Sequence, residues 1–365
     1  MATTTGLPTL SISFKAAAQE AANRAKKGTA AVIVRDSKAQ GVHPMNSAAL
    51  IPEELGTANQ EYIRSAFTGS DRGAPSLVIA LVIAPGTETT EALEEGLKLI
   101  SAYGIDYIAA PSDATAAELA ALNTWVKAQR ALYRTVKLVR PFAATGSDDM
   151  GIIELEETGA YAGTKSVSAA YLCGRIAGIL AGTGMGQSCT YAALPELTEV
   201  AARSVSEQEA AIKAGKLILV HDGRQAKIAR GVNSLTTIPS DGKADWCKIK
   251  IVEGMDIITY FLRTTIENSY IGRYANTYDN KQLLITAVSD YLLYLESAGV
   301  LTAGESYAEI DYSAQLRWLN SQGVDTSAMD RQAILEYQTG SWVFLRCGGR
   351  LVDAMEDFEI NFSNL

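Results

Sequence analysis

The feature that most constrains the fold is a run without polar side chains, Leu77 to Ile83, which Pro85-Gly86 closes. The run has the length of a strand. Helical spacing of apolar residues follows over 91–102 and 114–134, with a second apolar run, Tyr107 to Ala110, between them. Short, wholly apolar strands that alternate with helices are typical of a parallel sheet covered on both faces. The first half of the chain therefore predicts an α/β domain.

The same alternation continues on both sides of this region. Ala30 to Val34 and Val136 to Val139 are strand-like, and Ile152 to Leu155 with a helix over 164–180 adds another strand-helix unit. A Gly-rich stretch then leads to Ser206 and Glu209, a capping-box pair for a helix that ends at Gly215. We place a domain boundary near residue 200.

The second half predicts a mixed α+β domain. Two Gly-containing dipeptides, each between strand-like runs, indicate two-residue hairpins. The predicted hairpins pair 216–221 with 224–230 through Asp222-Gly223, and 342–347 with 350–355 through Gly348-Gly349. Long amphipathic helices are expected over 253–271 and 280–297.

Composition excludes several classes of function. The chain has 365 residues and a formal net charge of -9, which favours two domains and argues against nucleic acid or an anionic membrane as the partner. Two histidines and four widely spaced cysteines argue against a metal site or a His-dependent nucleophile, and we expect no catalytic residue and no cofactor. Neither a secretory signal nor a membrane span is recognisable, which favours synthesis in the cytoplasm.

Several motifs resemble catalytic or ligand-binding sites. For each of them a purely structural role is favoured. Gly159 to Ser166 resembles a phosphate loop but has the wrong spacing, and Gly182 to Gly186 follows a helix where a dinucleotide fingerprint follows a strand. Asp148-Asp149, the acids of 154–157, and His221 beside Asp222 are interpreted as surface groups.

A basic cluster stands out in this acidic chain. It is either a solvated hairpin or a docking face for an acidic protein surface. Its members are Lys213, Lys216, Arg224, Lys227 and Arg230.

Each end of the chain carries a lone alternating segment. Burial of a large apolar side chain yields about 1.5–3 kcal/mol, whereas ordering costs about 1–2 kcal/mol per residue. Such a segment becomes stable when it also pairs with a sheet edge, either its own or that of another molecule. The apolar positions are Leu7, Leu10, Ile12 and Phe14 at the start and Phe358, Ile360 and Phe362 at the end.

The chain resembles contractile tail sheath proteins of bacteriophages and of phage-tail-like bacteriocins of Gram-positive hosts. The resemblance lies in Gly6 to Phe14 with the Ala/Lys helix and Gly28 to Val34, in Lys227 to Thr237, and in Arg350 to Ile360. It extends over essentially the whole chain.

The resemblance implies a non-enzymatic subunit that polymerises around an inner tube and contracts to drive the tube through a target cell envelope. Its implied partners are further copies, in stacked hexameric rings or a helical sheath, the inner tube protein, and baseplate and tail terminator proteins. The implied parts are an N-terminal arm (1–27), an outer α/β domain (28–200), an inner α+β domain (201–355) and a C-terminal arm (356–365). The acceptor strand for a neighbour's arm is then expected at Trp342, Val343, Phe344 and Leu345.

Two other interpretations stay open at this point. One is a soluble α/β enzyme that binds a nucleotide at the carboxyl edge of the first sheet. The other is a tube or baseplate component of the same machine.

Overall fold

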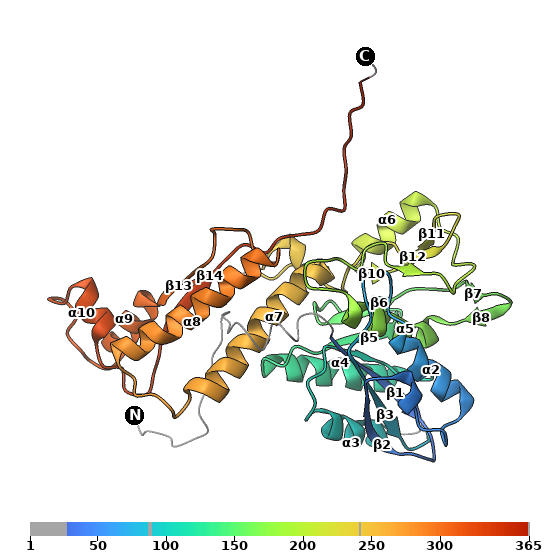
Figure 1. Ribbon diagram of the computed structural model, residues 1–365, viewed down its shortest axis with the longest axis horizontal. Helices are drawn as coiled ribbons and strands as arrows, with labels where there is room; N and C mark the ends of the chain where they lie inside the picture. Colours follow the sequence, from blue (N-terminus) through green and yellow to red (C-terminus); the bar gives the residue numbers. More distant parts are fainter. Residues whose placement is uncertain (1–27, 87–89, 241, 364–365) are drawn as a thin grey trace. The chain divides into compact units, whose positions relative to one another are not determined.

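The computed structural model describes residues 28–86, 90–240 and 242–363. The described chain divides into two compact units, a large unit of residues 28–253 with 353–363 and a small unit of residues 254–352. Figure 1 traces both units along the sequence. The predicted N-terminal arm, with Leu7, Leu10, Ile12 and Phe14, lies outside the described residues.

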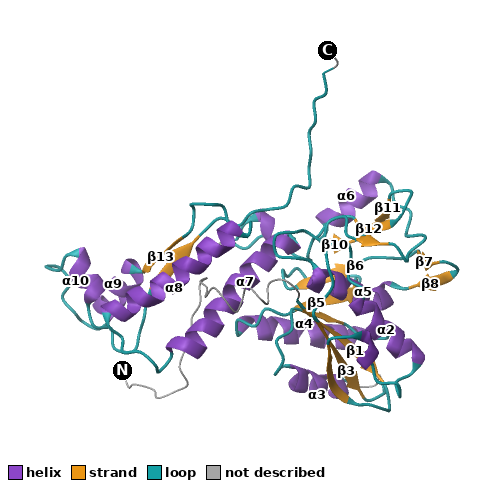
Figure 2. Ribbon diagram, in the orientation of Figure 1, coloured by secondary structure: helices purple, strands orange, loops and turns teal. Residues whose placement is uncertain are grey.

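A seven-stranded sheet forms the centre of the large unit (Figure 2). Its strand order is β10-β6-β5-β4-β1-β3-β2, and every neighbouring pair is parallel except β2 with β3 at one edge. The strands are Thr29–Arg35 (β1), Gly41–Met45 (β2), Leu77–Ile83 (β3), Tyr107–Ala109 (β4), Lys137–Pro141 (β5), Ile152–Leu155 (β6) and Lys216–Leu217 (β10).

Helices cover both faces of this sheet. Alternate residues of the central strand β1 point to opposite faces, so that Val32 packs in one apolar core and Ile33 in the other. The first core contains α2 (Thr57–Phe67) and α5 (Ala169–Gly182), and the second contains α3 (Glu91–Ile100) and α4 (Ala116–Ala131). The predicted α/β architecture is confirmed.

Small elements complete the large unit. A three-stranded antiparallel sheet has the order β11-β12-β9, and β7 pairs with β8 in a hairpin. The elements are Ala48–Leu50 (η1), Ala160–Ala162 (β7), Lys165–Val167 (β8), Ala193–Leu194 (β9), Val205–Lys213 (α6), Leu219–His221 (β11), Ala226–Ile228 (β12) and Ala244–Cys247 (η2).

The division between the units follows residue 253, whereas the sequence pattern suggests a boundary near residue 200. The reason is that Lys216 and Leu217 pair with Glu154 and Leu155 of β6 and so extend the large sheet. Residues after 200 therefore share the core of the large unit.

Three local predictions differ from the structure. The predicted helix over 164–180 begins only at Ala169, with Ser168 as its N-cap, because 160–167 forms a hairpin. The capping box of α6 is Ser204 with Glu207, two residues before the predicted pair. The loop between β11 and β12 spans Asp222 to Gln225, four residues rather than the predicted two.

The small unit is built on two long helices. Phe261 of α7 (Ile249–Thr265) stacks on Tyr291 of α8 (Tyr278–Ser297), with ring centroids 4.0 Å apart. The other elements are a π-helical turn Ile266–Tyr270 (η3), β13 (Tyr307–Ile310), α9 (Tyr312–Ser321), α10 (Arg331–Glu336) and β14 (Leu345–Gly348). β13 and β14 form a two-stranded antiparallel sheet.

The predicted hairpin through Gly348-Gly349 does not form. Leu345 and Gly348 pair with Ile310 and Tyr307 of β13, and after the strand Leu351 makes a single bridge to Leu301. β14 thus pairs with the more distant strand β13 and not with the residues that follow Gly348-Gly349.

In the ranges that the structure describes, no helix combines the length and apolar character needed to span a membrane.

Candidate assembly interface

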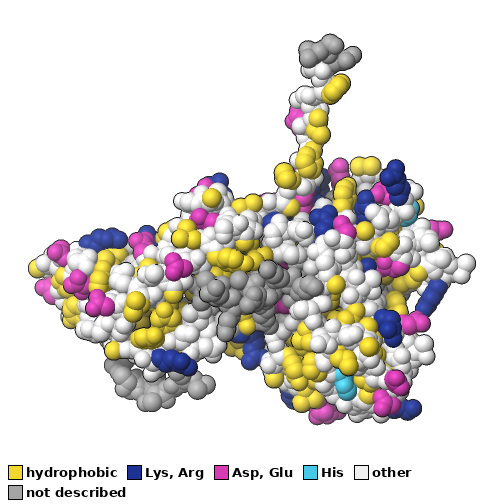
Figure 3. Space-filling view, viewed as in Figure 1, with side chains coloured by type: hydrophobic (Ala, Val, Ile, Leu, Met, Phe, Trp, Pro, Cys, Tyr) yellow, Lys and Arg dark blue, Asp and Glu magenta, His cyan; other side chains and the backbone are white. Residues whose placement is uncertain are grey.

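The C-terminal segment carries large apolar side chains that the subunit leaves exposed. Phe358, Ile360 and Phe362 are 71%, 82% and 88% exposed. The described residues after the Leu351 bridge form neither helix nor strand, and Figure 3 shows hydrophobic side chains along this projecting segment. Exposed apolar side chains at alternate positions are typical of a strand that awaits a sheet edge.

The root of the same segment is held firmly. The Glu356 side chain is only 7% exposed. Its Oε1 accepts hydrogen bonds from the hydroxyls of Ser188 and Thr190 at 2.7 and 2.6 Å. Arg230 Nε donates to its Oε2 at 3.1 Å. Bonds to a charged carboxylate are stronger than neutral ones, so this contact fixes the chain at residue 356.

Two further ion pairs lie beside Glu356. Arg230 Nη2 donates to Asp357 at 2.5 Å, and Lys248 pairs with Asp353. The hydrogen bond from Arg230 holds the pKa of Asp357 below its ordinary value and, in return, raises that of Arg230. Because Asp357 is 79% exposed, its pair contributes less than the shielded Glu356 contact.

The expected acceptor strand is only partly a strand. β14 begins at Leu345, and Trp342 to Phe344 precede it without regular secondary structure; the Trp342 ring stacks on that of Phe344 with centroids 6.1 Å apart. Trp342 and Val343 are 47% and 42% exposed. Within the described residues β13 and β14 have no other strand beside them, so the sheet offers unpaired edges.

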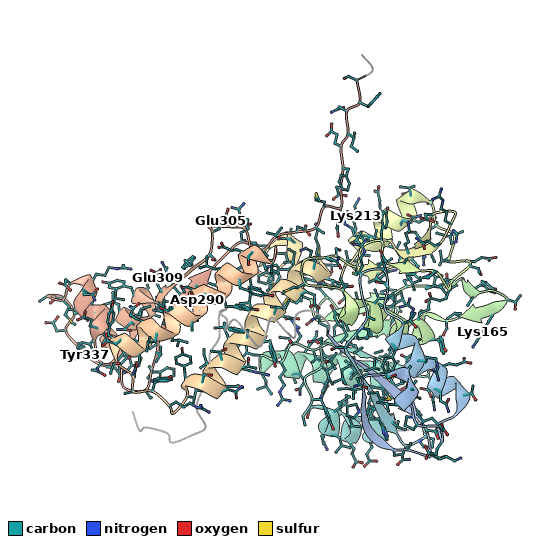
Figure 4. All side chains as sticks on the ribbon, viewed as in Figure 1. Lys165, Lys213, Asp290, Glu305, Glu309 and Tyr337 are labelled. Atoms are coloured by element: carbon teal, nitrogen blue, oxygen red, sulfur yellow. The ribbon has the colours of Figure 1, made fainter. Side chains whose placement is uncertain are left out.

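The basic cluster is more neutralised than its sequence suggests. Lys216 pairs with Glu156 at 2.6 Å, Lys213 with Glu209 at 3.5 Å, and Lys227 with Asp222. Arg230 forms an ion pair with Glu356. Lys213, labelled in Figure 4, and Arg224 are exposed. The exposed positive charge is therefore smaller than the five residues imply.

The glycine motif forms no phosphate loop. Gly163 occupies the turn between β7 and β8 with φ of +62°, and Lys165 is 65% exposed and pairs with Glu61 at 3.0 Å. The segment Gly182 to Gly186 ends α5 and leads into a loop.

The acidic groups considered from sequence have structural partners. Glu154 is buried with Arg140 at 3.2 Å, and Asp149 accepts from the Gly151 amide. Asp148 accepts the amides of Thr236 and Thr237, which lowers its pKa strongly. Over the described ranges no group of three or more His, Cys, Asp or Glu side chains is placed to hold a metal ion.

Sequence reasoning missed Ser188, Thr190 and Glu356. Neither hydroxyl belongs to a motif, and Glu356 lies more than 160 residues from both. One feature of the sequence did point to this site: Arg230 belongs to a basic cluster that has few acidic residues near it in sequence. Its acidic partner, Glu356, comes close to it only in the folded chain.

Two family models match the chain. The model described as phage tail sheath protein central domain matches residues 86–234, and the phage tail sheath C-terminal domain matches residues 241–363. A protein named tail sheath protein from Clostridium phage phiCD119 is 32% identical over 356 residues, which cover 97% of this chain and 98% of that protein.

Solved structures share the fold at low sequence identity. A sheath tail protein from Listeria innocua matches with a TM-score of 0.67 and 14% identity, over 92% of this chain and 98% of that one. A chain from the anti-feeding prophage helical sheath in its contracted state matches with a TM-score of 0.67 and 13% identity, over 98% and 99%.

Proposed function

The chain belongs to the phage tail sheath protein family and is a structural subunit of a contractile tail sheath; we propose that copies of it polymerise around an inner tube by exchanging terminal strands. The observation that carries the proposal is the C-terminal segment, anchored at Glu356 and apolar but exposed beyond it.

The exposed segment fits a strand-donating arm. Burying Phe358, Ile360 and Phe362 yields about 1.5–3 kcal/mol each, against about 1–2 kcal/mol for each residue ordered. Apolar burial alone therefore contributes little net free energy to association. Backbone hydrogen bonds to a sheet edge make association favourable.

The two-stranded sheet β13–β14 is the proposed acceptor. Among the described residues no further strand joins β13 and β14, and Trp342 and Val343 offer exposed apolar surface beside Leu345. The N-terminal segment with Leu7, Leu10, Ile12 and Phe14 is proposed as a second donor on its sequence pattern.

Removal of Phe358 to Leu365 tests strand donation. The truncated protein is expected to keep its melting temperature, since the described residues among them, 358–363, form no strand, and to fail to form striated hollow cylinders in negative-stain microscopy. Normal polymerisation of the truncated protein would falsify the proposal.

We further propose that the basic cluster faces the tube protein. Charge reversal at Lys213 and Arg224 is the cleaner test, because both are exposed while Arg230 also holds the arm. Weaker co-sedimentation with tube polymers, most visible at low salt, is expected. Co-sedimentation equal to that of an exposed control, Lys98→Glu, contradicts this docking role.

The remaining parts of the proposal follow from family membership. Subunits made in the bacterial cytoplasm assemble in the tail of the particle between a baseplate and a terminator. Contraction of the polymer drives the tube through the target envelope, with the arms acting as hinges between copies. The subunit itself contributes contacts and no chemistry.

A further inference from the structure

The hydroxyls that bind Glu356 are also held by hydrogen bonds that do not involve Glu356. The Ser188 hydroxyl accepts the Thr190 amide at 3.1 Å, and the Thr190 hydroxyl accepts the Gly231 amide at 2.9 Å. Between them the Cys189 side chain is buried against Gly231, where an added Cβ would lie 2.6 Å from its sulfur. Backbone groups thus fix both hydroxyls in place. We name Ser188, Thr190 and Arg230 the Glu356 cradle.

The root of the C-terminal segment contacts the large unit through the acidic side chains of Glu356 and Asp357. Met355 is 88% exposed and Phe358 is 71% exposed on either side of the held pair Glu356-Asp357. Apolar packing therefore does not hold the root, and the charged hydrogen bonds of the cradle do. The cradle lies in the segment that the central-domain model matches, and Glu356 in the segment that the C-terminal model matches.

We propose that the Glu356 cradle is a lock that ties the root of the donor arm to the large unit of its own subunit and so directs the arm toward the neighbouring copy. The inference rests on the proposed strand exchange. Glu356 acts as a positioning residue, since the donated side chains begin only at Phe358.

The lock has a consequence for assembly rate. With Asp357 held, Phe362 is five residues from a fixed point; with the lock open it is nine residues from Asp353, which still pairs with Lys248. Effective concentration falls roughly as the −3/2 power of the flexible length, so a nearly doubled length lowers it about twofold. Loss of direction lowers it further.

Glu356→Gln tests the lock from the arm, and Thr190→Val tests it from the cradle. The matched control is Glu359→Gln, which removes an exposed acid of the same segment. Amide order parameters of residues 354–357 are expected to fall from about 0.85 toward 0.6 or less in the two lock variants and to stay unchanged in the control. Melting temperatures report whether the subunit remains folded.

The second measurement is the initial polymerisation rate by light scattering. Both lock variants are expected to polymerise at least about twofold more slowly than the control. An unchanged root in Glu356→Gln overturns the lock. A loosened root with a control-like rate overturns its directing role while leaving strand exchange intact. Failure of strand exchange itself appears separately, as polymerisation of the protein truncated before Phe358.

Discussion

At the residue scale, two cationic side chains, one half-buried and one buried, show how far a side chain's role depends on its surroundings. Arg230 gains two acidic oxygens, one each from Glu356 and Asp357, through folding and fixes a chain segment. Lys281, on the first turn of α8, is only 3% exposed, and the Thr339 hydroxyl lies 3.4 Å from its Nζ. Burial without an acid lowers the pKa of Lys281.

Substitution of Lys281 by Met is expected to raise the unfolding free energy at pH 7 by about 1 kcal/mol or more. Met has a similar length to Lys but carries no charge, so the substitution removes the cost of burying the ammonium group. The unfolded chain binds this proton more tightly than the folded chain, so the unfolding free energy of the parent rises as pH approaches the ordinary lysine range. Urea unfolding from pH 7 to 10 should show that rise in the parent and a flatter profile in the variant. Lys98→Met, at an exposed position, is the control; a steeper profile in Lys281→Met contradicts the argument.

At the element scale, the close approach of α2 and α5 depends on glycine. A Cβ at Gly178 would lie 2.0 Å from the Ala66 carbonyl oxygen and 2.7 Å from its carbon, so the two helices touch backbone to backbone. Both helices pack on the same face of the sheet, beneath Val32 and Val34. The tightest helix pair of the large unit is therefore set by a residue with poor helix propensity.

Gly178→Ala is expected to destabilise the large unit by about 1–3 kcal/mol despite the better helix propensity of Ala, because the helices must move apart. Thermal unfolding measures the loss. Gly96→Ala is the matched control, since its Cβ would meet the methyl end of Ile83 at 2.8 Å rather than backbone. Equal melting temperatures for Gly178→Ala and the parent would show that the helix pair can relax.

At the scale of the whole molecule, the apolar residues that stabilise the fold differ from those that we propose for assembly. The two cores lie on the faces of the large sheet, while three of the most exposed apolar side chains lie on one terminal segment. The subunit folds without burying them. We propose that association with another copy buries them.

Replacing Phe358, Ile360 and Phe362 together by Ser is expected to leave folding unchanged and to prevent polymerisation. A loss of about 1.5–3 kcal/mol per side chain raises the critical concentration by about a thousandfold or more. Sedimentation across a concentration series measures it. Ala at Glu359, Asn361 and Ser363, the alternate positions, is the control, and equal critical concentrations for the two triple variants argue against a donated strand.

Short-range patterns were sufficient for the sheet and its helices. The wholly apolar Leu77 to Ile83 forms β3 with the predicted bounds, and Ile152 to Leu155 forms β6. β3 is covered on both faces of the sheet, so its run of apolar residues is continuous, whereas β6 carries the buried Glu154, which pairs with Arg140. Turn chemistry was less reliable: Gly348-Gly349 favours a hairpin locally, but β14 pairs with β13 about forty residues earlier.

What the sequence determined by itself is the α/β class, the strands with both faces buried, and an apolar alternating C-terminal segment, because each depends on periodicity within a few residues. Tertiary structure alone decided that Lys216 and Leu217 belong to the large sheet and that Arg230 meets Glu356. Both depend on residues far apart in the chain, whose encounter is fixed by packing and charge in three dimensions. In the folded chain, Arg230 of the basic cluster therefore anchors an exposed apolar segment.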